Sequence, residues 1–223
     1  MNACKQCGTC CLKGGPTLHS DDRPLIRSGV LALGDLVTIR RHEPVLSPLT
    51  NALEHARQEF VRVRGSAGSW RCPFLTEALT CGIYSQRPLE CRALACWDTA
   101  AIEALIYRDV LTRLDLIPTD APLREEMIRH ETACPHERFA ALAIEYGKNG
   151  NQRVPPALRA MIEQDLEIRH AAVCRHGLTR DEELFAFGRP FFLTLDAYGL
   201  ELENTGGPAF RIRFRAGSRF TSG

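Results

Sequence analysis

The sequence lacks the features that would place the chain in a membrane or on the secretory route. Its 223 residues contain no apolar run near the ~20 residues that span a bilayer. The first residues carry no apolar core of the length that a signal peptide needs. The formal net charge is only +1, which excludes strong attraction to nucleic acid or to a membrane surface. We therefore expect a cytoplasmic protein with no nucleic-acid and no membrane partner.

Several motifs of common enzyme classes are also missing. The chain has no GxGxxG after a strand, no GxxxxGKS or GxxxxGKT, no GxSxG and no HExxH. These absences exclude dinucleotide enzymes, P-loop hydrolases, serine hydrolases of the nucleophile-elbow type and zinc proteases of the HExxH type. The Cys-x3-Cys-x2-Cys triplet of radical enzymes is absent as well.

Cysteine, by contrast, is abundant and unevenly placed. The chain has 10 cysteines, and it is long enough to build a core without disulfides. In a reducing compartment a dense cysteine group indicates metal ligands or reactive thiols. A chain terminus with few apolar residues stays ordered only if something holds it, which favours metal ligation here. The candidate metal ligands are Cys4, Cys7, Cys10, Cys11, Cys72, Cys81, Cys91 and Cys96.

The spacing of the first cysteines bears on the metal. Two cysteines separated by two residues usually supply two of the four ligands of a structural zinc site. Three in succession, Cys4-x2-Cys7-x2-Cys10, with a distant fourth, are closer to the ligation of a four-iron iron-sulfur cluster. We expect an iron-sulfur cluster of the 4Fe–4S type, with zinc as the alternative. Adjacent side chains usually diverge, so either Cys10 and Cys11 serve different sites or only one of them is a ligand.

Two arginines accompany the later cysteines in the segment CGIYSQRPLECRALAC. Guanidinium groups lower thiol pKa values and offset thiolate charge. They also bind carboxylates and other anions. We therefore expect Arg87 and Arg92 to bind an anionic cofactor or substrate group beside the metal.

The order CKQCGTCC, CPFL, CGIYSQRPLECR resembles the CxxCxxCC cysteine-cluster family (YkgJ-type proteins) over roughly residues 4 to 96. The family is described as zinc- or iron-chelating and includes the flagellin lysine N-methylases. The resemblance implies that Cys4, Cys7, Cys10, Cys11, Cys72, Cys81 and Cys91 are ligands. Cys96 stands where many relatives also place a cysteine. The rest of the chain resembles no family that we can name.

The patterns predict an α+β fold, with a cysteine-rich, metal-organised N-terminal half packed with a mainly helical C-terminal half that ends in a small β-meander. We expect a metal-binding region, residues 1–98, and a helical region, residues 99–223, in one compact unit. EFVRVRG alternates as a strand does and is expected to pair with WRCPFL. Helices are expected at 33–42, 102–114, 122–133 and 135–147, from Pro155 or Pro156 onward, and at 179–188.

Four residues outside the cluster have simple structural interpretations. Cys134 and Cys174 are expected to be buried with the helices, as free cysteines often are. His19 and His136 are expected to be solvent-facing helix caps rather than further ligands.

Three functions agree with the sequence, and it leaves open whether the protein is an enzyme. The first is a metal-cluster-binding protein, most simply iron-sulfur, in redox or as an accessory to protein modification. The second, implied by the resemblance, is a protein lysine N-methyltransferase-type enzyme. The third is a zinc-stapled interaction module with a protein partner of unspecified kind.

Overall fold

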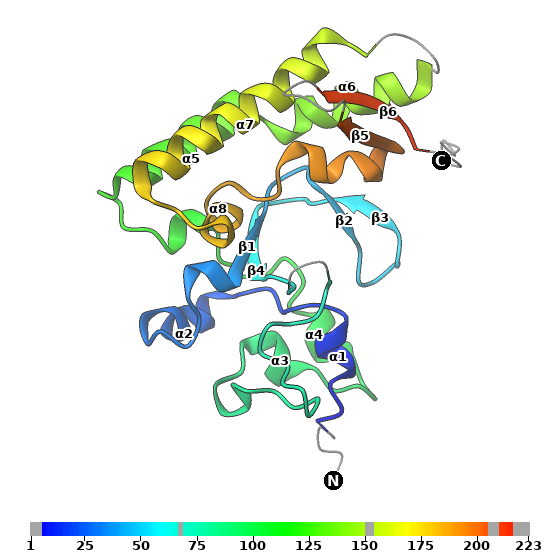
Figure 1. Cartoon of the computed structure of the whole chain (residues 1–223). Coiled ribbons are helices and arrows are strands. Elements are labelled where there is room, and N and C mark those ends of the chain that lie inside the picture. Colours follow the sequence, from blue (N-terminus) through cyan, green and yellow to red (C-terminus); the bar gives the residue numbers. More distant parts are fainter. Residues whose placement is uncertain (1–5, 67–68, 150–153, 205–209, 216–223) are drawn as a thin grey trace. The chain divides into compact units, whose positions relative to one another are not determined.

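The computed structural model describes residues 6–66, 69–149, 154–204 and 210–215 (Figure 1). By its contacts the chain divides into two units. Unit 1 comprises Met1–Ile39, Glu59–Arg124 and Leu178–Gly188; unit 2 comprises Arg40–Gln58, Glu125–Gly177 and Arg189–Gly223. Contacts do not tell which segments fold independently, so the division at residue 98 stays a prediction.

Unit 1 is built on a two-stranded antiparallel sheet. Strand β1 (Leu36–Ile39) pairs with β4 (Phe60–Val63), with Leu36 opposite Val63. Helix α8 (Arg180–Phe187) packs on β1, where the Thr38 hydroxyl donates a hydrogen bond of 2.5 Å to the Phe185 carbonyl. The other helices of this unit are short: α1 (Thr9–Leu12), η1 (Ser20–Asp22), α2 (Arg23–Arg27), η2 (Leu33–Asp35), η3 (Tyr84–Gln86), α3 (Leu89–Ala93), α4 (Ala100–Glu103) and η4 (Arg113–Asp115).

Three expectations for unit 1 are corrected. The helix predicted at 33–42 is wrong, because the β-branched run Val37–Ile39 forms strand β1. The strand within EFVRVRG is confirmed as β4, but its partner is β1 and not residues 70–75. The helix predicted at 102–114 stops at Glu103, since Tyr107 and Asp109 adopt positive φ angles of 59° and 49° that no right-handed helix contains.

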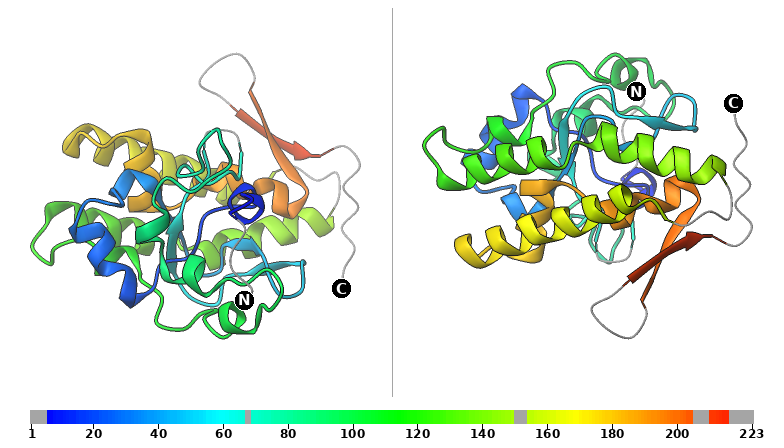
Figure 2. Two further views of the ribbon diagram at one scale, coloured as in Figure 1. Left: turned by 90° about the horizontal axis from the view of Figure 1, so that it is seen from below. Right: turned by 90° about the horizontal axis from the view of Figure 1, so that it is seen from above.

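Unit 2 is dominated by long helices, α6 (His136–Asn149) and α7 (Pro156–His176), which run side by side (Figure 2). Together with η5 (Phe191–Tyr198) they enclose an apolar core in which the rings of Phe139 and Phe191 stack with centroids 4.1 Å apart. Two hairpins complete the unit. They are β2 (Pro44–Leu46) with β3 (Leu53–His55), and β5 (Leu200–Asn204) with β6 (Phe210–Phe214).

The longer helices were predictable. Helix α5 (Pro122–Ala133) has the expected bounds, and α6, α7 and α8 are confirmed. The expected meander is a hairpin of two strands, because its first segment, Phe191–Tyr198, is a 3₁₀ helix. The mixed α+β class is confirmed. Within the described residues, no helix has the length and apolarity needed to cross a membrane.

Candidate metal centre

The N-terminal cysteines are held by a tight turn. Gly8 has a left-handed φ of 71° and leads into α1, which carries Cys10 and Cys11. A Cβ atom on Gly8 would lie 2.9 Å from the carbonyl oxygen of Leu79, so glycine is needed both for conformation and for space. The turn at Gly8 therefore lies directly against the loop that follows Cys72.

Cys72 and Cys81 lie at the two ends of this loop. The Cys72 amide donates a 2.7 Å hydrogen bond to the Cys11 carbonyl, which ties the loop directly to α1. Within the loop, Leu75 forms a β-bridge with Cys81, and the Gly82 amide donates to the Phe74 carbonyl at 2.8 Å. The backbone thus brings Cys72 and Cys81 to the same side as the N-terminal thiols.

Cys91 comes from helix α3, which is held in place by hydrogen bonds of the buried Asp22 and the partly buried Glu90. Asp22 Oδ1 accepts from the Leu89 amide at 2.8 Å, and Glu90 Oε2 accepts from the Thr17 amide at 2.7 Å. Both bonds connect α3 to the segment just after the N-terminal cysteines.

His19 belongs to the same support and is 1% exposed, so the expectation of a solvent-facing cap is wrong. Its Nε2 lies 3.5 Å from Glu90 Oε1. Burial lowers the pKa of His19, but hydrogen bonds to Glu90 and to the Arg108 carbonyl outweigh it, so the pKa is raised. The Asp22 side chain accepts a 3.0 Å hydrogen bond from the His19 amide and so caps the short helix η1. The three-residue spacing of His19 and Asp22 is the sequence signal for this cap.

Five thiols gather in this way: Cys10, Cys11, Cys72, Cys81 and Cys91. Burial raises the pKa of Cys91, and negative charge on any of the other four raises it further. Burial, followed by the charge of Cys10, raises the pKa of Cys11 to about 12. Burial, and then negative charge on Cys81 and Cys10, also raises the pKa of Cys72. Without a cation these thiolates repel one another, and a bound metal ion removes that penalty. The donor set therefore fits a thiolate-bound metal.

Cys10 and Cys11 converge, although adjacent side chains were expected to diverge. Their Sγ atoms are 3.9 Å apart. Two thiolates on one tetrahedral zinc ion, each at about 2.3 Å, lie about 3.8 Å from each other. The structure thus gives the pair the separation of two ligands on one zinc ion.

Two further candidates, Cys7 and Cys96, are placed differently. Cys7 is exposed, with its Sγ 3.3 Å from Thr9 Oγ1, and Cys96 is exposed between α3 and α4. Cys4 lies outside the described residues. The complete ligand set of eight cysteines stays a prediction.

The two arginines near the later cysteines have partners within the chain. Arg92 Nη1 donates a 2.5 Å hydrogen bond to the Arg87 carbonyl. The Arg87 guanidinium lies over the Tyr84 ring, 3.6 Å from its centroid. The buried Nε of Arg87 has no hydrogen-bond partner in the described part of the chain. Anion binding by Arg87 and Arg92 stays a prediction.

Unit 2 contains a separate group of buried charges, which the sequence analysis missed. Asp165 Oδ1 contacts His130 Nε2 at 2.6 Å and accepts from Arg169 Nε at 2.8 Å, and all three residues are at most 2% exposed. Burial lowers the pKa of His130 to about 4 despite the carboxylate beside it. Burial tends to raise the pKa of Asp165, but His130 and Arg169 lower it to about 2. The group is therefore a neutral imidazole and an ion pair at neutral pH.

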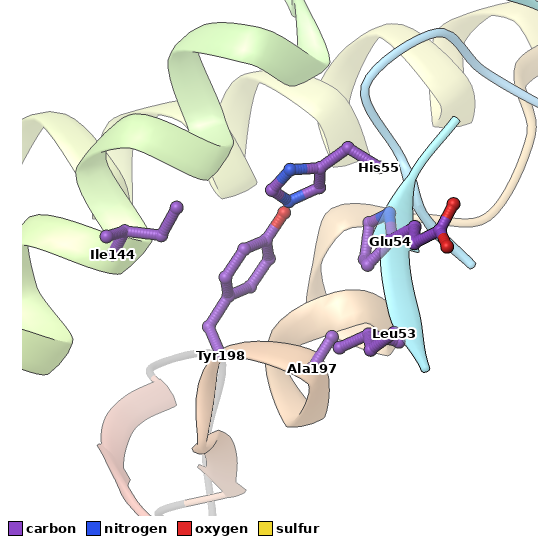
Figure 3. Close-up of a pocket in the computed structure, with 7 residues that line it drawn as sticks. Leu53, Glu54, His55, Ile144, Ala197 and Tyr198 are labelled. Carbon is purple, nitrogen blue, oxygen red and sulfur yellow. The ribbon is translucent and has the colours of Figure 1, made fainter. Parts of the chain in front are cut away.

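A pocket of about 150 Å³ also lies in unit 2, between β3, α6 and η5 (Figure 3). Leu53, Ile144 and Ala197 form its apolar walls, and the Tyr198 hydroxyl points toward His55. Small-molecule sites usually have volumes of about 300–1,000 Å³, and none of the lining residues is a cysteine. We therefore do not count this pocket as part of the metal centre.

A comparison with family models confirms the resemblance seen in the sequence. Residues 3–110 match the CxxCxxCC model, described as "Putative zinc- or iron-chelating domain". The match contains all eight candidate cysteines and both arginines. No curated protein and no solved structure matches the chain significantly.

Proposed function

Since residues 3–110 are a domain of the CxxCxxCC zinc- or iron-chelating family, we propose that this protein binds zinc through its gathered thiols. The observation that carries the proposal is the 3.9 Å separation of the Cys10 and Cys11 sulfurs. A four-iron cluster attaches each cysteine to a different iron atom, which keeps ligand sulfurs further apart. One zinc ion shared by Cys10 and Cys11 accounts for their convergence.

The remaining thiols complete the site. Cys72, Cys81 and Cys91 supply two further ligands for a closed tetrahedral ion and leave one thiol over. That spare thiol either replaces Cys10 or Cys11 or joins Cys4, Cys7 and Cys96 at a second ion. We favour a zinc-stapled interaction module, because Leu12, Trp70, Leu79 and Trp97 in the same segments are 46% to 66% exposed.

An iron-sulfur cluster is the second candidate. The repeated two-residue spacing from Cys4 to Cys10 favours it, as does the presence of more thiols than one zinc ion needs. Such a cluster would give the protein a redox role or an accessory role in protein modification. The lysine N-methyltransferase-type alternative rests on the family resemblance alone.

Anaerobic purification followed by metal analysis tests the proposal. We expect colourless protein that contains zinc, with one zinc ion per chain fewer in Cys11→Ser and an unchanged zinc content in Cys174→Ser, whose thiol is exposed on α7 of unit 2. Brown protein with equal amounts of iron and sulfide would overturn the zinc assignment and establish the iron-sulfur candidate. Protein that binds neither metal after reconstitution would overturn both.

A further inference from the structure

Unit 2 places three different metal-ligand side chains together, outside the residues that match the family model. His130 lies in the last turn of α5, Cys134 directly follows that helix, and Asp165 lies on α7. One ligand atom from each lies within 4.8 Å of the others, and all three residues are fully buried. Cys134 is buried as expected, whereas Cys174 is exposed and that expectation is wrong.

The local backbone explains why His130 and Cys134 share a face. They are four residues apart, and the Cys134 amide donates a helical hydrogen bond of 2.8 Å to the His130 carbonyl. Asp165 reaches them from α7, and its Oδ2 also accepts from the Phe191 amide at 3.1 Å. The Oδ2 atom of Asp165 is therefore held by the Phe191 amide, while its Oδ1 atom lies near the His130 imidazole and the Cys134 thiol.

The distances are close to those of a tetrahedral ion. His130 Nε2 and Asp165 Oδ1 are joined by a hydrogen bond of 2.6 Å. Nitrogen and oxygen ligands at about 2.0–2.1 Å from a tetrahedral zinc ion lie about 3.3 Å apart, and sulfur about 3.6 Å from either. Replacing the proton by an ion would widen the N···O contact by about 0.7 Å and draw the sulfur inward.

The neighbouring guanidinium groups do not leave the cluster with excess positive charge. Arg169 pairs with Asp165, and Arg40 donates to both carboxylate oxygens of Glu131, at 2.8 Å and 3.0 Å. Each guanidinium is matched by a carboxylate, so a divalent ion bound by a thiolate would add a single net charge.

His136 is a further buried polar side chain of unit 2, with its ring edge-on to Phe139 and Phe191 at centroid distances of 5.9 Å and 5.0 Å. It lies two residues beyond Cys134 and is 1% exposed, so the expected solvent-facing cap is wrong. Within the described part of the chain, neither of its ring nitrogens has a hydrogen-bond partner, and the carboxylate oxygen Oε2 of Glu43 lies 4.0 Å from Nε2. A buried imidazole with two unpaired nitrogens needs an explanation.

We propose that His130, Cys134 and Asp165 form a second metal site, for a borderline ion such as Zn²⁺, with water in the fourth position. A mixed nitrogen, sulfur and oxygen donor set suits zinc better than Mg²⁺ or Ca²⁺. Because the donors are buried, the ion joins the end of α5 to α7 and has a structural role.

Cadmium loading of the full-length protein tests this site. The protein, labelled with ¹⁵N-histidine, is dialysed against ¹¹³Cd²⁺ under reducing conditions and observed by ¹¹³Cd NMR. We expect one resonance coupled to a histidine nitrogen in addition to the resonances of the thiolate site in unit 1. Cys134→Ala should lose that resonance and one cadmium ion per chain, and Cys174→Ala should lose neither.

Equal cadmium contents in folded Cys134→Ala and Cys174→Ala would overturn the proposal, as would a histidine-coupled resonance that survives in Cys134→Ala. If Cys134→Ala does not fold, the wild-type spectrum decides. A spectrum in which no cadmium resonance couples to a histidine nitrogen overturns the site without reference to any variant.

Discussion

The thiol group of unit 1 and the buried charged group of unit 2 differ in their electrostatics. The five gathered thiols of unit 1 are alike, and burial, followed by negative charge on neighbouring thiols, raises the pKa of Cys11, Cys72 and Cys91. The His130–Asp165–Arg169 group of unit 2 combines unlike members that satisfy one another. A group of thiolates is stable only when a bound cation offsets their repulsion. The stability of a group of opposite charges depends instead on the protonation state of its members. The stability of unit 1 should therefore follow metal supply, and that of unit 2 in metal-free protein should follow pH.

Metal removal should give the largest effect. A structural metal site contributes on the order of 10 kcal/mol to folding. Chelation under reducing conditions should therefore release the amides of α1, α3 and the Cys72–Gly82 loop to hydrogen exchange, while the amides of α6 keep their protection. Equal loss of protection in α3 and α6 would contradict the contrast between the units.

Asp165→Asn should be the most damaging single change in unit 2. The substitution leaves the buried Arg169 without its carboxylate, and breaking such a pair costs about 3–5 kcal/mol. Urea denaturation of metal-free protein, followed by hydrogen exchange in α7, measures the loss. Glu163→Gln is the matched control on the same helix, because the Arg159–Glu163 pair is about half exposed and is worth at most about 1 kcal/mol. Similar losses in the free energy of unfolding in the two variants would show that the buried ion pair contributes no more to stability than the exposed pair.

Acid should destabilise unit 2 in two steps. The pKa of His130 is lowered to about 4 in the folded chain, so between pH 6.5 and 4 the unfolded chain binds the additional proton and the free energy of unfolding falls. Burial also lowers the pKa of His136, which acts in the same direction. The contribution of ionised Asp165, with its pKa at about 2, is lost as pH falls from 3.8 to 2.

Urea midpoints of metal-free protein between pH 7 and 2 measure this dependence. His130→Gln should flatten the slope between pH 6.5 and 4, and His170→Gln, at an exposed position of α7, should leave it unchanged. An unaltered slope in His130→Gln would assign the acid sensitivity to other groups.

Thr179→Ala should give the smallest effect and serves to calibrate the others. Thr179 caps α8 of unit 1 by accepting from the Glu182 amide at 3.2 Å, and such caps are worth about 1 kcal/mol. The loss should be the same with and without metal, because α8 carries no cysteine. A metal-dependent loss, read from hydrogen exchange of α8, would mean that the metal centre stabilises α8 as well.

Local signals in the sequence predicted the elements that local chemistry determines. Pro122 and the Thr179–Glu182 box mark helix starts, and α5 and α8 begin where they should. The helix predicted at 33–42 is wrong because Val37, Thr38 and Ile39 form a strand that depends on pairing with β4, more than 20 residues later. Pairing across such distances leaves no trace in either segment alone.

The candidate site shows the same limit. The motif order identified the cysteines, because thiol spacing is visible in the sequence. Neither the convergence of Cys10 and Cys11 nor the burial of His19 could be seen in the sequence. The first involves the hydrogen bond from the Cys72 amide to the Cys11 carbonyl, and the second involves the contact between His19 and Glu90. Each pair of residues is more than 60 positions apart in the sequence. His130 and Asp165 meet across 35 positions and belong to no recognisable motif.

The hydrogen bond from the Cys72 amide to the Cys11 carbonyl joins residues that the ribosome makes at different times. The first thiols leave the ribosome long before Cys91, with roughly 80 residues between Cys11 and Cys91. At roughly 5–20 residues per second, that interval lasts about 4–16 s. During this time Cys10 and Cys11 are nascent thiols without the distant thiols that complete the proposed zinc site. Loading of that proposed site in the cell would then depend on protection of the emerging chain from oxidation and from other metal ions.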